Sequence, residues 1–81
     1  MKIRKAPLGN KNMVGATVES IRKSRGIKQK DFVARLQTSG VDINPTSYSK
    51  LEGQVRVCTD IEVYTISKIL GVSIDELFKK R

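Results

Sequence analysis

Apolar residues recur at helical spacing along this chain. The clearest run is Val14, Val18 and Ile21, at i, i+4 and i+7, with polar residues between them and Gly26 after them. Such spacing places apolar side chains on one face of a helix, and glycine is common just past a helix end. The pattern predicts an all-α fold built from short amphipathic helices.

Five helices are predicted in this way. Ser73 and Glu76 form a capping box, and Asn44 followed by Pro45 suits a helix start, because proline costs nothing at the first helical position. The predicted helices run from Val14 to Gly26, over 29–37, over 45–52, from about Asp60 to Gly71, and from Ser73 through Phe78.

Residues 55–66 are ambiguous, because their apolar residues also alternate as in a strand. A helix from about Asp60 is favoured, since Thr59 or Asp60 can cap it, Val63 and Ile66 continue a helical period, and Gly71 can end it.

The chain offers no set of residues for metal or disulfide chemistry. It has 81 residues, one cysteine and no histidine, so one small domain must form without a disulfide or a Cys/His zinc site. Cys58 is interpreted as a small buried apolar residue, with a reactive thiol as the alternative. We expect no metal and no cofactor.

Enzyme chemistry is not expected either. The closest acid pairs, Asp60 with Glu62 and Asp75 with Glu76, fall in the first turns of predicted helices, where acids are structurally favourable. No phosphate-cradling glycine loop occurs. The chain also lacks an apolar stretch of membrane-spanning length and a secretory signal, which predicts a cytoplasmic protein with no membrane contact.

Positive charge is concentrated in the first two thirds of the chain. The net charge is +8; residues 1–56 carry 12 Lys/Arg against 4 Asp/Glu, and residues 57–81 carry 4 against 4. This imbalance favours a polyanionic partner. Residues 1–13 are predicted to be a mobile or extended basic arm. Residues 2–11 of it are predicted to track phosphates or enter a minor groove, with an uninvolved tail as the alternative. Residues 79–81 form a basic C-terminal end.

Two short helices, 29–37 and 45–52, suggest a helix-turn-helix, joined by the connection from Thr38 to Ile43. With SIRKSRGIKQKDFVARL, SYSKLEG and ISKILGVSIDELF in that order, residues 14–78 resemble the Cro/repressor-type helix-turn-helix family, also called the Xre family. The resemblance implies a compact five-helix lambda-repressor-like DNA-binding domain over 14–78.

The resemblance also implies contacts to double-stranded DNA. Thr46 and Lys50 fall where the family reads bases, and Lys50 can donate to guanine while Thr46 can meet a thymine methyl. Gln29, at the start of its helix, would contact a phosphate, and Asn44 and Ser47 would lie nearer the DNA backbone.

Other matched positions imply structural roles. Arg22 and Glu52 fall where the family commonly has an ion pair joining the first and third helices. Tyr48 and Leu51 match apolar core positions, with base stacking by Tyr48 as the alternative. Arg56, just past the third helix, is a phosphate candidate or else a solvated charge.

The sequence departs from the family pattern in the connection before the third helix. Leu36 and Tyr48 are twelve positions apart where the usual pattern needs about seven, which implies a turn longer by roughly five residues. Lys28 stands where the family usually has a small polar residue to cap the helix over 29–37. Val33 stands where the family usually has alanine, and Pro45 replaces a polar residue that often contacts bases.

The function implied is a sequence-specific transcriptional regulator, specifically a repressor that binds an inverted repeat as a homodimer. The alternative is a protein-interaction module, such as the antitoxin of a toxin and antitoxin pair or a small adaptor with a protein partner.

Overall fold

The computed structural model describes residues 7–79 and contains five α-helices in this part of the chain. The helices are α1 Gly15–Ser24, α2 Gln29–Thr38, α3 Pro45–Glu52, α4 Asp60–Leu70 and α5 Ile74–Leu77. Between residues 7 and 79 no strand is present, and the ambiguous segment is irregular up to Thr59 and helical from Asp60. The predicted all-α, five-helix fold is confirmed.

The predicted caps account for where α3, α4 and α5 begin. Asn44 accepts a hydrogen bond from the Ser47 amide at 2.8 Å, with Pro45 in the first turn. Thr59 and Glu62 form a reciprocal capping box, and Ser73 accepts from the Glu76 amide. These side chains satisfy amides that would otherwise have no partner within the helix.

Three of the five helices end in the same way. The left-handed residue after α1, α2 and α4 is a glycine, with φ of 69° at Gly26, 96° at Gly40 and 68° at Gly71. After α3, Gly53 has φ of −78°, and Gln54 takes the left-handed conformation with φ of 61°. The helix ends where Gly53 predicts, but the residue that reverses the chain is not the glycine.

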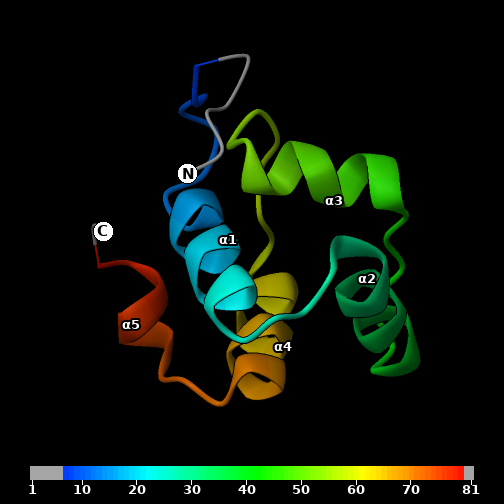
Figure 1. Cartoon of the computed structure of the whole chain (residues 1–81). Coiled ribbons are helices and arrows are strands. Elements are labelled where there is room, and N and C mark those ends of the chain that lie inside the picture. The colour runs from blue at the N-terminus through cyan, green and yellow to red at the C-terminus, as the bar shows by residue number, and fades with distance from the viewer. Residues whose placement is uncertain (1–6, 80–81) are drawn as a thin grey trace.

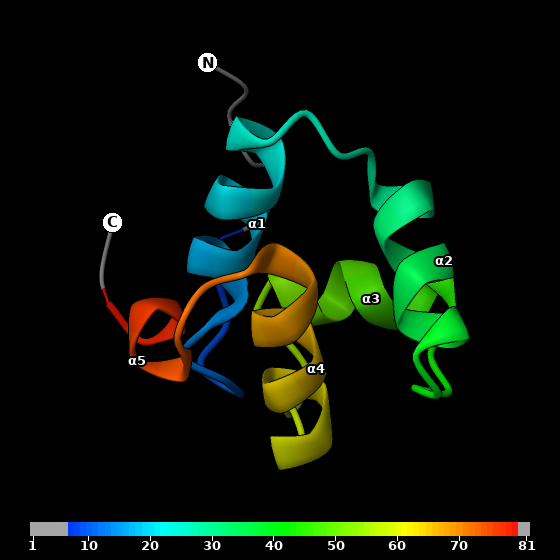
Figure 2. The same cartoon turned by 90° about the horizontal axis from the view of Figure 1, so that it is seen from below.

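The five helices share one core. As Figures 1 and 2 show, α3 crosses over α1 and α2 at one side of the molecule, while α4 lies beneath and α5 packs beside it. The rings of Phe32 and Tyr48 are tilted, with centroids 5.4 Å apart, and join α2 to α3. The buried apolar residues are Val14, Val18, Ile21, Phe32, Val33, Leu36, Val41, Ile43, Tyr48, Leu51, Ile66, Leu70 and Leu77.

The connection between α2 and α3 is a packed segment. It spans residues 39–44, and both Val41 and Ile43 are buried while Asp42 between them is exposed. The Gln37 side chain donates to the Ile43 carbonyl at 2.8 Å. The connection therefore adds two side chains to the core and fixes where α3 starts.

The predicted N-terminal arm and the basic C-terminal end lie only partly within the described residues. Residues 9–12 lie against the end of α3, held by backbone and side-chain hydrogen bonds, and residues 1–6 of the predicted arm lie outside the described residues. Of the basic end, residues 80–81 also lie outside them. Cys58 is half-buried against the core.

Candidate nucleic-acid interface

Apart from Pro45 at its first position, the outer side of α3 carries polar side chains. Thr46, Ser49 and Lys50 are exposed, at i, i+3 and i+4, so they share one face of the helix. The opposite face is formed by Tyr48 and Leu51, which are fully buried. The structure therefore brings the two predicted base-contact residues, Thr46 and Lys50, onto the same exposed surface.

A buried ion pair fixes the inner side of α3 to α1. Arg22 Nε lies 2.7 Å from Glu52 Oε2 and Nη2 lies 3.2 Å from Oε1, and the two residues are only 5% and 1% exposed. Arg22 also donates to the Ile27 carbonyl at 2.7 Å. Burial acts to lower the pKa of Arg22, but the hydrogen bonds and charge of Glu52 raise it above its ordinary value.

Tyr48 completes this arrangement. Its hydroxyl donates to Glu52 Oε2. Burial, followed by the negative charge of Glu52, raises the pKa of Tyr48 well above its ordinary value, so the hydroxyl stays protonated as a donor. Tyr48 thus belongs to the core, as the sequence predicts, and no aromatic face is left for stacking on a base.

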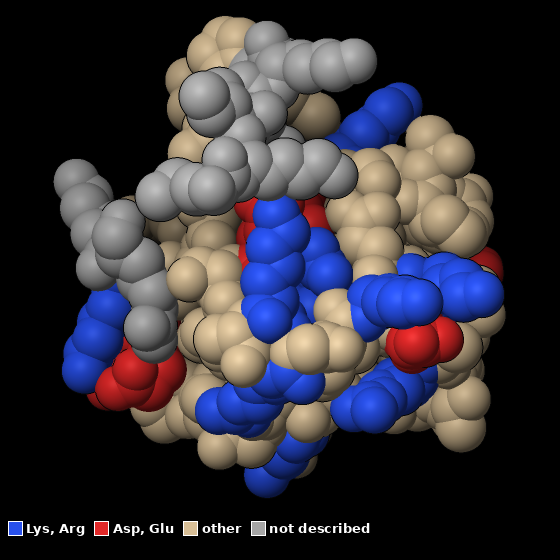
Figure 3. Space-filling view, viewed as in Figure 1, with Lys and Arg blue, Asp and Glu red and all other residues tan. Residues whose placement is uncertain are grey.

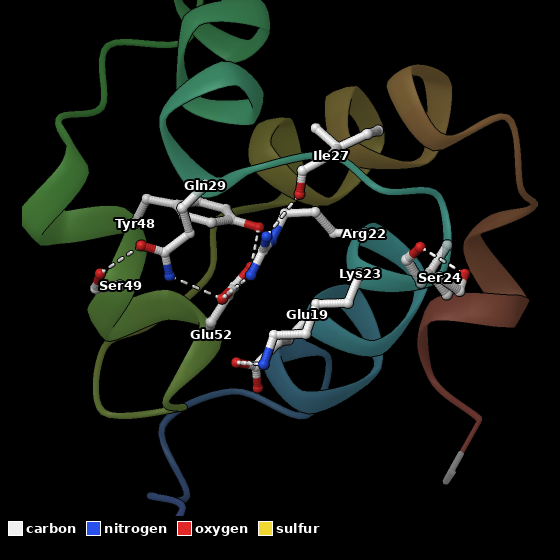
Figure 4. A network of polar contacts seen from close by, with 10 residues as sticks. Glu19, Arg22, Lys23, Ser24, Ile27, Gln29, Tyr48, Ser49 and Glu52 are labelled. Atoms are coloured by element: carbon white, nitrogen blue, oxygen red, sulfur yellow. Dashed lines mark hydrogen bonds and ion pairs between the residues drawn. The ribbon is translucent and has the colours of Figure 1, made fainter. Parts of the chain in front are cut away.

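Gln29 links the start of α2 to α3. Its Nε2 donates to Glu52 Oε1 at 3.0 Å, and its Oε1 accepts from the Ser49 hydroxyl at 3.2 Å. Figure 4 shows Gln29, Arg22 and Tyr48 converging on Glu52. Lys28 makes no side-chain cap for the first amides of α2. Gln29 therefore ties the start of α2 to α3 through Glu52 and Ser49.

Arg56, the other predicted phosphate residue, sits in an ion pair just after α3. Its Nη1 lies 3.0 Å from Glu62 Oε1, and its side chain is 28% exposed. Burial acts to raise the pKa of Glu62, but hydrogen bonds from Arg56 and from the Thr59 amide lower it below the ordinary value. One end of the Arg56 guanidinium is thus engaged, and the group remains at the surface.

Basic side chains gather on a neighbouring face. Figure 3 shows lysines and arginines over α1, α2 and the segment between them, with few acidic groups. The exposed basic residues of this region are Lys23, Arg25, Lys28, Lys30 and Arg35. This charge lies next to the start of α2 and would favour a polyanion there.

The described chain has neither a candidate metal site nor a helix suited to cross a membrane. Among residues 7–79, no group of three or more His, Cys, Asp or Glu side chains could hold a metal ion. In the same range, no helix has both the length and the apolar character that a bilayer crossing requires.

Three residues that contact or support α3 carry no individual prediction from the sequence: Ser49, Gln54 and Asn12, of which Asn12 lies within the predicted basic arm. Asn12 and Gln54 each bond to residues about forty positions away, as in the 2.9 Å bond from Asn12 to the Arg56 carbonyl. Short-range periodicity carries no signal for such contacts.

Comparisons with known proteins give one match. A family model described as "Helix-turn-helix domain" matches residues 15–81, which include all five helices. No curated protein and no solved structure matches the chain.

Proposed function

Because this chain belongs to the helix-turn-helix domain family, we propose that it is a sequence-specific DNA-binding transcriptional regulator whose α3 enters the major groove. The observation that carries the proposal is the two-sided character of α3. Its outer face presents Thr46, Ser49 and Lys50, while a buried ion pair holds its inner face. A helix fixed on one side and polar on the other can present its side chains to base edges in a constant position.

Lys50 and Thr46 are the proposed base-contact residues. The Lys50 ammonium can donate to guanine O6 and N7, and Thr46 can use its hydroxyl or place its methyl against that of thymine. Ser49, which shares their face and bonds to Gln29, joins this surface. Pro45 supplies no side-chain hydrogen bond, so base reading rests on the other exposed residues of the helix, Thr46, Ser49 and Lys50.

Phosphate contacts are proposed around this face. Gln29 has a second Nε2 hydrogen and lies beside amides that have no side-chain cap, and Asn44 and Ser47 flank the start of α3. Arg56 can direct its remaining guanidinium hydrogens outward while Nη1 stays paired with Glu62. Residues of the basic N-terminal arm would add further contacts.

We infer that the regulator is a repressor of the Cro/repressor-type (Xre) group and acts as a homodimer on an inverted repeat. One module contacts too few bases to be selective, so two half-sites about one helical turn apart are expected. Exposed Val57, Ile61 and Tyr64, which are 63%, 67% and 55% exposed, support contact with another protein surface. Sedimentation of the free and DNA-bound protein measures the stoichiometry, and one chain per operator would contradict the dimer.

Selection from a random duplex pool tests sequence-specific binding. We expect an enriched motif at moderate salt, because Lys50 and Thr46 discriminate between base edges. Lys50→Ala should relax the preference at one base position, whereas Arg56→Gln, at a proposed phosphate contact outside α3, should weaken binding to all sequences alike. Lys68→Ala, on α4, is a charge-matched control for Lys50→Ala. If the pool shows no enriched motif, sequence-specific regulation is ruled out.

A further inference from the structure

Residues 9–12 are hydrogen-bonded across the C-terminal end of α3. The Gly9 amide donates to the Gly53 carbonyl and the Lys11 amide to the Gln54 carbonyl, both at 2.9 Å. Figure 1 shows this N-terminal segment beside the end of α3 and above α1. Both carbonyls belong to the two residues that directly follow α3, so these bonds tie the segment to the chain where the helix ends.

Asn12 is the centre of this contact. Its Nδ2 donates to the Leu51 carbonyl at 3.0 Å and to the Arg56 carbonyl at 2.9 Å. Its Oδ1 accepts from the Val14 and Gly15 amides at 3.0 Å and 2.8 Å. One amide group therefore donates to the last turn of α3 and to the segment that follows it, and accepts at the start of α1.

The backbones approach so closely here that only glycine fits at two positions. A Cβ on Gly15 would lie 2.3 Å from the Leu51 carbonyl oxygen, and a Cβ on Gly9 would lie 2.3 Å from the Gln54 carbonyl oxygen. Backbone atoms cannot yield as a flexible side chain can. The start of α1 and the end of α3 are thus in direct backbone contact, without a layer of side chains between them.

Gln54 reinforces the contact from the α3 side. Its left-handed conformation is uncommon for a residue with a Cβ. The side chain offsets this, since Oε1 accepts from the Ala16 amide at 3.0 Å and Nε2 donates to the Gly9 carbonyl at 3.1 Å. The end of α3 is therefore tied to both α1 and the N-terminal segment.

We propose that Asn12 is a positioning residue for DNA recognition: it fixes the end of α3 against α1 and so holds Lys50 and Ser49 in register with the bases. This proposal rests on the DNA-binding function proposed above. Lys50 lies within one turn of Leu51 and Glu52, so movement of the helix end would move its side chain. Base readout tolerates only displacements of about half an ångström, which makes such fixation a determinant of specificity.

Asn12→Asp separates the two functions of the side chain. Aspartate keeps an oxygen for the Val14 and Gly15 amides, where a negative charge is favourable, but it has no N–H for Leu51 and Arg56. Asn10→Asp is the matched control, because Asn10 is exposed and the variant makes the same charge change two residues away. Asn12→Ser keeps a cap and adds no charge, and it replaces Asn12→Asp should the latter not fold.

Two measurements test the proposal. Hydrogen exchange should be faster, by about tenfold, at the Gly53, Gln54 and Val55 amides in Asn12→Asp and Asn12→Ser than in Asn10→Asp. The affinity ratio between the selected site and a scrambled duplex should also fall by about tenfold in the Asn12 variants alone. Circular dichroism should show the same helix content in all of them.

Each outcome of these measurements supports or contradicts the positioning role of Asn12. Unchanged exchange in both Asn12 variants would overturn the fixation of α3 by Asn12. Faster exchange with an unchanged affinity ratio would show a purely structural contact and overturn the positioning role. If the unmodified protein selects no sequence, the proposed function and the positioning role both fail, and the exchange data still show whether Asn12 holds the helix end.

Discussion

Glu52 is an acidic residue with almost no exposed surface, and its carboxylate accepts four hydrogen bonds. The donors are Nε and Nη2 of Arg22, Nε2 of Gln29 and the hydroxyl of Tyr48. Within residues 7–79 no buried side-chain polar atom lacks a partner. A buried charge of this kind is tolerated because every lone pair is used, and losing one partner leaves others unsatisfied.

Glu52→Gln should therefore lower the free energy of unfolding by about 3–5 kcal/mol, because it leaves the buried Arg22 guanidinium without a countercharge. Urea denaturation measures the loss. Glu19→Gln is the matched control, since the Glu19 carboxylate is paired with Lys23 at 3.1 Å on the surface and such pairs contribute about 0–1 kcal/mol. Equal losses in the two variants would show that Glu52 behaves as a surface charge.

At the scale of elements, the sequence predicts starts better than ends and connections. Asn44, Thr59 and Ser73 act as caps within three residues of their partners, so a local pattern identifies them. The left-handed Gln54 could not be predicted, because its conformation depends on bonds to Gly9 and Ala16.

In the candidate site too, local sequence patterns predict some features, whereas others depend on residues distant in the sequence. The exposed positions of Thr46 and Lys50 follow from helical periodicity, since Tyr48 and Leu51 had to face the core. Gln29 bonds to Glu52, and Arg56 pairs with Glu62. Neither contact could be predicted, because both depend on how helices and loops meet in space. The buried pair Val41 and Ile43 lies in the predicted connection, where a helical period gives no signal, and only their alternation around the exposed Asp42 marks them as core.

The α4 capping box gives the domain a sensitivity to acid. The folded-state pKa of Glu62 lies below the ordinary value of 4.5, so its carboxylate contributes stability above about pH 4.5 that is lost as pH falls through the folded pKa. Glu62→Gln should be less stable than the unmodified protein at pH 7, and the difference should shrink below about pH 4.5. Thermal unfolding across pH 3–7 measures it.

Asp60→Asn serves as the comparison, because Asp60 is exposed in the same first turn of α4. Its effect should be smaller and should depend less on pH. A Glu62→Gln difference that stayed constant from pH 7 to pH 3 would contradict a role for the Glu62 charge.

At the scale of the whole molecule, the excess of positive charge predicts salt-dependent DNA binding. Neutralised phosphates release counterions, so the logarithm of affinity should fall linearly with the logarithm of salt concentration. Arg56→Gln should reduce that slope by about one if Arg56 makes the proposed phosphate contact. Fluorescence anisotropy titrations with one duplex at several salt concentrations measure the slope.

Lys68→Gln is the control for this measurement, since Lys68 is exposed on α4 and its ammonium lies 5.2 Å from the centre of the Tyr64 ring. It should leave the slope unchanged. An equal decrease in both variants would mean that the slope reports overall charge and that Arg56 makes no particular contact.

The hydrogen bonds of Asn12 indicate that residues before the first helix fold together with the five helices. A truncated chain starting at Met13 would retain all five helices yet lose the Gly9, Lys11 and Asn12 bonds to the end of α3. From the helix boundaries alone, one would expect this truncation to leave the stability of the domain unchanged. The cooperative unit is therefore expected to include residues 9–12, whose contacts close only with residues some forty positions later in the chain.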